Sequence, residues 1–231
     1  MGIPLYLAMT GAEFTACGAL PEKAAWMACH FSLSRDGLSN LPQHLPPGSM
    51  VILDDSIPML HHDPQGIKNT LLELIEQFSV EKILLDFQRS YSSALADLAQ
   101  LLAEALPCPV GVSHIYGELG NLPVFLPAPA VITSLSHAVD PWKGQELWLE
   151  IPGICAQYSI TESSCDLTEL PLQDRHLFSH ADDELHLHYR IELHDRKADF
   201  FLQHDLPSYL SNAEKCGVTA AVGLYRELKP K

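Results

Sequence analysis

The stretch Lys82-Ile83-Leu84-Leu85-Asp86-Phe87 decides the fold. Its unbroken apolar run is typical of a parallel strand that is covered on both faces. A helix is predicted on each side of it. Asp63-Pro64 starts the helix before it, with Asp as the N-cap and Pro in the first turn. Ser92 or Ser93 can cap the helix that follows. This alternation of strand and helix predicts repeated βαβ units.

Further apolar segments extend the series, and seven strands are predicted at residues 4–9, 25–31, 50–53, 109–115, 130–135, 146–151 and 220–226. A strict alternation over 185–193, with a hairpin partner at 198–203, indicates an antiparallel insertion within about 155–205. A helix from 207 to about 216 ends at Gly217. We therefore predict one (β/α)₈ barrel over residues 1–231, with shortened or missing helices around the fifth and sixth strands. An open doubly wound sheet is the alternative.

Composition restricts the class of protein. The 231 residues include 14 Lys and Arg against 29 Asp and Glu, which gives 14 − 29 = −15. With 47% hydrophobic and 19% charged residues, global disorder is not expected. The acidic balance, without a basic run, argues against nucleic acid and against an anionic membrane surface as partners. No apolar stretch is long enough to span a membrane, and no signal peptide is evident, so a cytoplasmic location is expected.

The known cofactor and nucleophile motifs are missing from the sequence. It contains no P-loop, no G-x-G-x-x-G and no G-x-S-x-G, so no cofactor is predicted. The six cysteines form no C-x-x-C pair and are expected to be reduced thiols. No metal is predicted either. The adjacent His61 and His62 cannot easily both face one ion, and Asp63 is already the predicted helix cap. The sequence gives no indication of an oligomeric state.

In a (β/α)₈ barrel the active site forms at the C-terminal ends of the strands. The polar residues at the predicted ends are His30, Asp54, Asp55, Asp86, Gln88, Arg89, His114, Tyr116, Tyr158, Tyr225, Arg226 and Glu227. Asp86 and Gln88 are two apart on one strand, so their side chains are expected to point to the same side. The alternative for Asp86 is a structural role, either as a helix cap or as an ion-pair partner of Arg89.

Several phrases of the sequence resemble those of one enzyme family when they are taken in order. Residues 83–88 align with the end of the motif D-x-x-D-x-D-x-E. Leu147-Trp148-Leu149-Glu150-Ile151-Pro152 is similar to "lxLGiPxYG". Residues 187–210 and 216–225 are similar to "pyFxY…g…hxVWFeDaxSixaK" and "yGLrGisyW". These are phrases of the family 18 glycoside hydrolases, the chitinase-like barrels, in their spore-type and peptidoglycan-linked members.

The departures from that family concern its catalytic residues. The resemblance implies that the last Glu of the motif is the general acid and that the Asp before it orients the acetamido group of the substrate. Asp86 matches that Asp, but Gln88 stands at the position of the acid. The two earlier Asp positions fall on Leu84 and Glu81. The family's "MxYD" is not evident in 131–137, and Tyr225 replaces the Trp at the barrel end.

The expected function is therefore a hydrolytically silent barrel that binds a carbohydrate or another small polar ligand. Asp86, Gln88, Asp54 and Asp55 form the predicted, degenerate catalytic set. The predicted ligand-binding residues are His30, Phe87, Arg89, His114, Tyr116, Tyr158, Tyr225 and Glu227, and Trp142 is a further stacking candidate. One alternative is an active glycosidase on N-acetylated glycans that uses another acid, such as Asp54, Asp55 or Glu227. Another is a non-catalytic structural or interaction protein.

Overall fold

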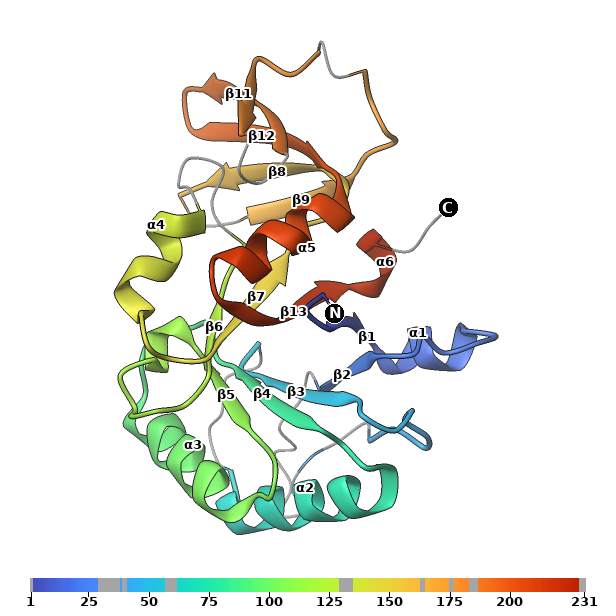
Figure 1. Ribbon diagram of the computed structural model, residues 1–231, viewed down its shortest axis with the longest axis vertical. Helices are drawn as coiled ribbons and strands as arrows, with labels where there is room; N and C mark the ends of the chain where they lie inside the picture. Colours follow the sequence, from blue (N-terminus) through green and yellow to red (C-terminus); the bar gives the residue numbers. More distant parts are fainter. Residues whose placement is uncertain are drawn as a thin grey trace.

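A computed structural model describes residues 2–28, 38, 41–56, 62–128, 135–162, 165–174, 177–182 and 187–228. Eight parallel strands close into a barrel in the order β1-β13-β7-β6-β5-β4-β3-β2 (Figure 1). Their bounds are β1 Leu5–Met9, β2 Ala24–Ala28, β3 Met50–Asp54, β4 Lys82–Asp86, β5 Val110–Ser113, β6 Val124–Leu126, β7 Leu147–Ile151 and β13 Val218–Leu224. The predicted (β/α)₈-type barrel is confirmed, and the open sheet is excluded.

The helices around the barrel differ greatly in length. The two long ones, α2 (Pro64–Phe78) and α3 (Ser93–Ala105), lie together on one side of the barrel (Figure 1). Asp63 caps α2 as predicted and accepts a hydrogen bond from the Gln65 backbone N–H at 3.1 Å. Short elements stand elsewhere: α1 Gly11–Ala16, η1 His114–Tyr116, α4 Leu135–Val139, η2 Asp140–Trp142 and α6 Tyr225–Leu228. The described helices after β5 and β6 are thus short, as the sequence predicts.

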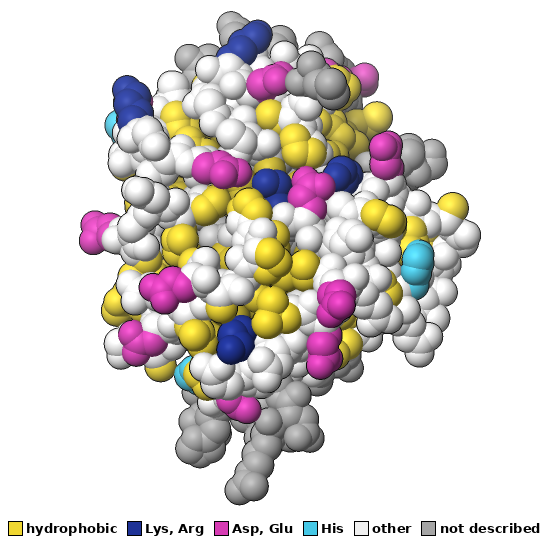
Figure 2. All heavy atoms as spheres, turned by 60° about the horizontal axis from the view of Figure 1, so that its bottom comes forward, with side chains coloured by type: hydrophobic (Ala, Val, Ile, Leu, Met, Phe, Trp, Pro, Cys, Tyr) yellow, Lys and Arg dark blue, Asp and Glu magenta, His cyan; other side chains and the backbone are white. Residues whose placement is uncertain are grey.

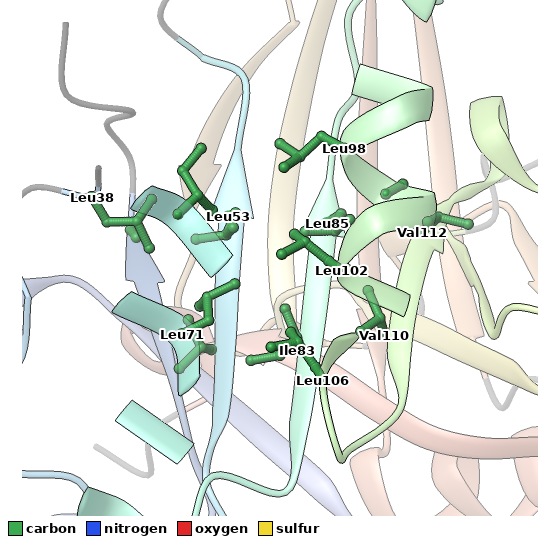
Figure 3. Close-up of a cluster of buried hydrophobic side chains, with 14 of the residues drawn as sticks. Leu38, Leu53, Leu71, Ile83, Leu85, Leu98, Leu102, Leu106, Val110 and Val112 are labelled. Atoms are coloured by element: carbon green, nitrogen blue, oxygen red, sulfur yellow. The ribbon is translucent and has the colours of Figure 1, made fainter. Parts of the chain in front are cut away.

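A layer of apolar side chains between the barrel and its long helices forms the largest core cluster. Ile83 and Leu85 of β4 face Leu98 and Leu102 of α3, and all four are buried (Figure 3). They alternate along β4 with Leu84, which belongs to a second cluster inside the barrel. Both faces of β4 are therefore covered, which explains its unbroken apolar sequence.

Trp148 of β7 is the largest fully buried side chain of the cluster inside the barrel. Its indole is fully buried and reaches across to β5, where an ideal Cβ on Gly111 would lie 2.3 Å from the ring. A glycine at position 111 therefore provides the space that the indole occupies. The Trp148 Nε1 donates a hydrogen bond to Glu146 at 2.8 Å, toward the N-terminal end of the barrel. The interior of the barrel is therefore a packed core, and a ligand can meet its side chains only at the ends.

The sixth strand differs from the prediction. We expected it at 130–135, but β6 is Val124–Leu126 and Leu135 begins α4. Residues 130–134 lie outside the described residues. The strand is three residues long and stands between Pro123 and Pro127, so it is too short to show a periodic pattern. The predicted second strand, 25–31, is observed as Ala24–Ala28, and its last three residues also lie outside the described part.

An antiparallel sheet follows the C-terminal end of β7. Its strands are β8 Cys155–Thr161, β9 Cys165–Glu169, β10 His180–Asp182, β11 Leu187–His194 and β12 Lys197–His204, in the order β10-β11-β12-β8-β9. The predicted hairpin of β11 and β12 is confirmed, but it is part of a five-stranded sheet (Figure 1). The chain returns to the barrel through α5 (Leu206–Lys215), with Gly217 at a φ of 90° after the helix.

One face of the molecule shows how its charged side chains are distributed. On the face seen in Figure 2, Asp and Glu side chains are spread between apolar and neutral ones, and Lys and Arg do not form a continuous basic patch. Within the described ranges, none of the helices has the length and hydropathy needed to cross a membrane.

Candidate functional site

Three carboxyl side chains face the inside of the barrel at its C-terminal end. Asp54 ends β3, Asp86 ends β4 and is its register partner, and Glu150 is the next-to-last residue of β7. The residues two positions earlier, Ile52, Leu84 and Trp148, belong to the cluster inside the barrel. Because side chains alternate along a strand, the three carboxyl groups point to the same interior. We call this group, together with Gln88, the barrel mouth.

Asp86 and Gln88 are joined directly. The Gln88 Nε2 donates a hydrogen bond to the Asp86 Oδ1 at 2.8 Å. Burial raises the pKa of Asp86 to about 7, and the charges of Glu150, Asp54 and Asp55 act in the same direction, whereas the Gln88 hydrogen bond lowers it. The prediction that the two side chains point to one side is therefore confirmed. A carboxyl group with a pKa near neutrality is a feature of functional sites.

Glu150 was not among the predicted site residues. Burial raises the pKa of its carboxyl group, and its Oε2 accepts a hydrogen bond from the Ala128 backbone N–H at 3.0 Å, which lowers the pKa. The sequence does contain a signal for it. Glu146, Trp148 and Glu150 alternate on one side of an otherwise apolar strand, and a charged residue in that position has no ordinary packing role.

The hydrogen bonds of Asp55 favour a structural role for its side chain. Its carboxylate is buried and accepts hydrogen bonds from the backbone N–H groups of Gln88 at 3.0 Å and Arg89 at 3.1 Å. It thereby ties the end of β3 to the loop that follows β4. Asp54 accepts a hydrogen bond from the Ser56 backbone N–H at 2.9 Å. The Arg89 guanidinium donates to the Ser56 carbonyl oxygen, so its observed partner is on the β3 loop and not Asp86.

Two of the predicted stacking residues lie in the core instead of the barrel mouth. Phe87 and Tyr116 are buried, with their ring centroids 5.9 Å apart and nearly perpendicular. The Tyr116 hydroxyl accepts a hydrogen bond from the Ser92 backbone N–H at 3.0 Å. Phe87 follows Asp86, so the alternation of β4 turns it outward toward α3. Tyr91 stacks on Tyr116 at 5.2 Å and is 59% exposed, which makes it the accessible ring of this group.

The other predicted residues are dispersed. Tyr158 lies on β8 opposite Phe200. It packs against a third core cluster, formed by buried side chains of β6, β7, β12, β13 and α5. The Tyr225 hydroxyl lies 3.6 Å from the Cys17 Sγ, at the start of α6. The Glu227 side chain is 3% exposed and lies against Gly153, just beyond β7. His114 is exposed at the start of η1.

Two further predicted residues are His30 and Trp142. His30 lies outside the described residues. Trp142 is half-buried in η2, and its ring takes the space next to Gly117, where an ideal Cβ would lie 2.3 Å away. The indole of Trp142 thus packs against the chain that follows β5 and against the same core cluster as Tyr158.

A pocket of about 240 Å³ adjoins this end of the barrel, between the loops that follow β3 and β4 and the first turn of α3. Its lining consists of Asp55, His62, Arg89, Ser90, Ser92, Ala94 and Leu95. It brings together Asp55 and Arg89 of the predicted set. Within the described part of the chain, three or more His, Cys, Asp and Glu side chains are nowhere grouped as a metal ion would require.

Glu81 belongs to the opposite end of the barrel. It aligns with the first Asp of the family motif, but it precedes β4 and binds two residues there. The Tyr6 hydroxyl donates to its Oε1 at 2.6 Å, and the Lys23 Nζ donates to its Oε2 at 2.8 Å. These hydrogen bonds lie at the N-terminal end of the barrel, where residues usually contribute to stability and not to catalysis. Glu81 therefore does not join the carboxyl groups of the barrel mouth.

Comparison with known proteins identifies the fold. No protein-family model matches the chain, and no curated protein matches it in sequence. The crystal structure of the spore cortex-lytic enzyme SleL of Bacillus cereus is similar, with a TM-score of 0.55, 9% identity, and coverage of 96% of this chain and 70% of SleL. SleL of Bacillus megaterium QM B1551 gives a TM-score of 0.52 and 10% identity over the same shares. The chain thus shares the barrel fold of these two enzymes.

Proposed function

We propose that the protein is a family-18-like barrel that binds a carbohydrate or glycan-like ligand at the barrel mouth without hydrolysing it. The observation that carries this proposal is the pair of Asp86 and Gln88. The amide donates to the carboxyl group at 2.8 Å, at the place where the resembling enzymes have a Glu as general acid. A side-chain amide has no proton to transfer near neutral pH, whereas general acid catalysis contributes about 10²–10⁴-fold to the rate.

The neighbouring acids do not take over this role readily. Asp55 is engaged by two backbone N–H groups, and the Glu227 side chain is enclosed beside Gly153. Asp54 is bound to the Ser56 backbone. None of these three acids is placed to protonate a glycosidic oxygen at the barrel mouth. Their positions therefore support a binding role for the barrel mouth over a catalytic one.

A glycan is the favoured ligand for two reasons. The fold is shared with two spore cortex-lytic enzymes, and the sequence phrases resemble the peptidoglycan-linked members of family 18. The barrel mouth also offers amide and carboxyl groups above the buried indole of Trp148, and such groups can donate to and accept from sugar hydroxyls. Fragments with N-acetylglucosamine units are therefore the first ligands to test.

One observation favours a second candidate, an active glycosidase. The pKa of Asp86 is raised to about 7, mainly by burial, and a carboxyl group of this kind can transfer a proton near neutral pH. In that case Asp86→Asn abolishes the release of reducing ends, while Gln88→Ala leaves it unchanged.

Calorimetry with N-acetylglucosamine oligomers and with muropeptide fragments tests the proposal, together with a reducing-end assay on the same samples. We expect saturable heat and no new reducing ends. Turnover would replace the first proposal by the second. A folded protein that gives no heat with any glycan would instead favour a structural or interaction role.

A further inference from the structure

The chain passes between the barrel and the antiparallel sheet at two crossings that contact each other. It leaves the barrel through residues 152–154, after β7, and it returns through His204 and Asp205, before α5. The His204 backbone N–H donates a hydrogen bond to the Ile154 carbonyl oxygen at 3.0 Å, so the two crossings are joined directly. We call residues 152–154 and 204–205 the neck of the sheet.

The side chain of His204 makes a second link across the neck. Its Nε2 lies 2.8 Å from the Pro152 carbonyl oxygen, and because a carbonyl oxygen only accepts, the Nε2 carries the proton of this hydrogen bond. His204 is 4% exposed, and its ring packs on that of Tyr209 in α5, with the ring centroids 5.0 Å apart. One buried imidazole thus contacts the outgoing chain and the helix that follows the returning chain.

The other nitrogen of the imidazole is buried without a hydrogen bond. Among the residues that the structure describes, none supplies a partner for the His204 Nδ1. This atom is an acceptor in the neutral ring and a second donor in the protonated ring. Protonation would therefore add both a charge and an unpaired N–H to an enclosed setting, and each is costly there. The neck as it stands accommodates the neutral ring.

Two carboxyl groups and one phenol approach the neck from the described elements around it. Asp205 is the side-chain cap of α5, and the buried Tyr209 belongs to the same helix. Glu227 of α6 has a side chain that is 3% exposed and lies against the outgoing chain. Burial lowers the pKa of His204 from its ordinary value, while the neck carbonyl groups and the charge of Asp205 raise it. Burial is the larger effect, so the pKa stays lowered.

We propose that His204 is an acid-sensitive latch, which holds the antiparallel sheet to the barrel while its ring is neutral and releases the neck when the ring is protonated. In the released form the imidazole is exposed to water and takes up a proton with the ordinary pKa of histidine, about 6.5. Docking of the sheet is therefore complete above about pH 6.5 and weakens as the pH falls below it, because the released form binds a proton more readily than the docked form.

The latch does not depend on the proposed glycan binding. The sheet follows the C-terminal end of β7, which is the end of the barrel that carries the barrel mouth. Release of the neck therefore changes the surroundings of the barrel mouth, whatever ligand binds there.

Hydrogen exchange followed by mass spectrometry tests the latch between about pH 7 and about pH 5.5. Peptides that cover residues 151–156 and 202–207 report on the neck, and peptides that cover β4 report on the barrel in the same sample. After correction for the intrinsic exchange rates, we expect the protection of the neck amides to fall at least about threefold over this interval. The amides of β4 should keep their protection.

His204→Gln removes the titration and keeps the hydrogen bond. Its amide can still donate to the Pro152 carbonyl oxygen but cannot be protonated, so the protection of the neck should no longer depend on pH. His180→Gln is the matched control. His180 is exposed on the edge strand β10 of the same sheet, and its variant should behave as the wild type.

Three results would overturn the latch. They are neck protection that is constant with pH in the wild type, an equal fall in the wild type and in His204→Gln, and an equal fall in β4, which would indicate unfolding of the whole protein. If His204→Gln does not fold, an NMR titration of the wild type decides the question. The latch requires the neck amides to change with the same midpoint as the His204 ring, and separate midpoints refute it.

Discussion

Gln88 donates a hydrogen bond from its Nε2 to the Oδ1 of Asp86 over 2.8 Å, at the end of the fourth barrel strand. The bond uses the amide as a donor to a carboxyl group whose pKa burial raises to about 7. It orients both side chains toward the barrel mouth without supplying a transferable proton. Under the proposed function, the two side chains take the place of a catalytic pair in which an amide stands instead of the acid.

Replacing Gln88 by Glu should restore that acid. The new side chain has nearly the same size and can still hydrogen-bond Asp86 when it is protonated. We expect the release of reducing ends from N-acetylated oligomers to appear at a rate at least about 10²-fold above that of the wild type, the lower end of general acid catalysis. The rate is measured by a reducing-end assay.

Gln88→Ala is the matched control for this experiment. It removes the amide without adding an acid, and no turnover is expected from it. Equal rates for Gln88→Glu and Gln88→Ala would refute the assignment of position 88 to the lost acid.

The ionised form of Asp86 should lower the free energy of unfolding at neutral and alkaline pH. Its pKa is raised from 3.8 to about 7 in the folded protein, so folding favours the protonated form. The destabilisation is absent below about pH 4, grows as the pH rises to 7 and is complete above 7. Asp86→Asn, which keeps the acceptor for Gln88, should raise the free energy of unfolding by on the order of a few kcal/mol at pH 8 and change it little at pH 4.

Thermal denaturation at the two pH values measures this difference, with Asp97→Asn on the exposed face of α3 as the control. For a chain of this size, the expected gain in Tm for Asp86→Asn at pH 8 is roughly 5–10 °C. A gain of the same size at pH 4, or an equal gain for Asp97→Asn, would contradict the account.

Asp55 should matter for stability. Asp55→Ala leaves the backbone N–H groups of Gln88 and Arg89 without their acceptor, which costs about 2–4 kcal/mol. Asp55→Asn keeps one oxygen and should cost less. Urea denaturation gives both values. An Asp55→Ala protein as stable as the wild type would show that the carboxylate does not join the two loops.

Gly111 should tolerate no side chain while Trp148 is present. An ideal Cβ there would lie 2.3 Å from the indole, so Gly111→Ala should destabilise the barrel by about 1–3 kcal/mol. Trp148→Leu frees that space, and the double variant should be more stable than the sum of the two single effects predicts. Gly18→Ala is the control, because a Cβ on Gly18 has nothing within 4 Å. Additive effects of Gly111→Ala and Trp148→Leu would rule out the proposed contact.

The sequence predicts the barrel well where strands are five residues or longer and lie beside clear helix signals. β4 and α2 are examples, since the apolar run and the Asp63-Pro64 cap each have one physical explanation. The insertion is also predicted, because the alternation in β11 is strict. β6 could not be found in this way. Its three residues form a strand only because the neighbouring β5 and β7 supply hydrogen-bonding partners.

The residues of the candidate site could be predicted only where local sequence information places them. Asp86 and Gln88 follow from the end of one strand, which is local information. Glu150 enters the site from β7, and its burial depends on how the barrel closes. Phe87 was expected to stack on a ligand, but it shares the outward face of β4 with Ile83 and Leu85. The alternation along β4 already predicts that Phe87 points outward. Its aromatic ring alone is not evidence that it stacks on a ligand.

Two readings on one sample of the wild-type protein show whether it binds a glycan without hydrolysing it. Tetra-N-acetylchitotetraose is titrated by calorimetry at about pH 6, and the same mixture is then assayed for new reducing ends after a long incubation. We predict saturable binding and no reducing ends above the protein-free blank. Reducing ends that accumulate in proportion to protein, and disappear with Asp86→Asn, would contradict it.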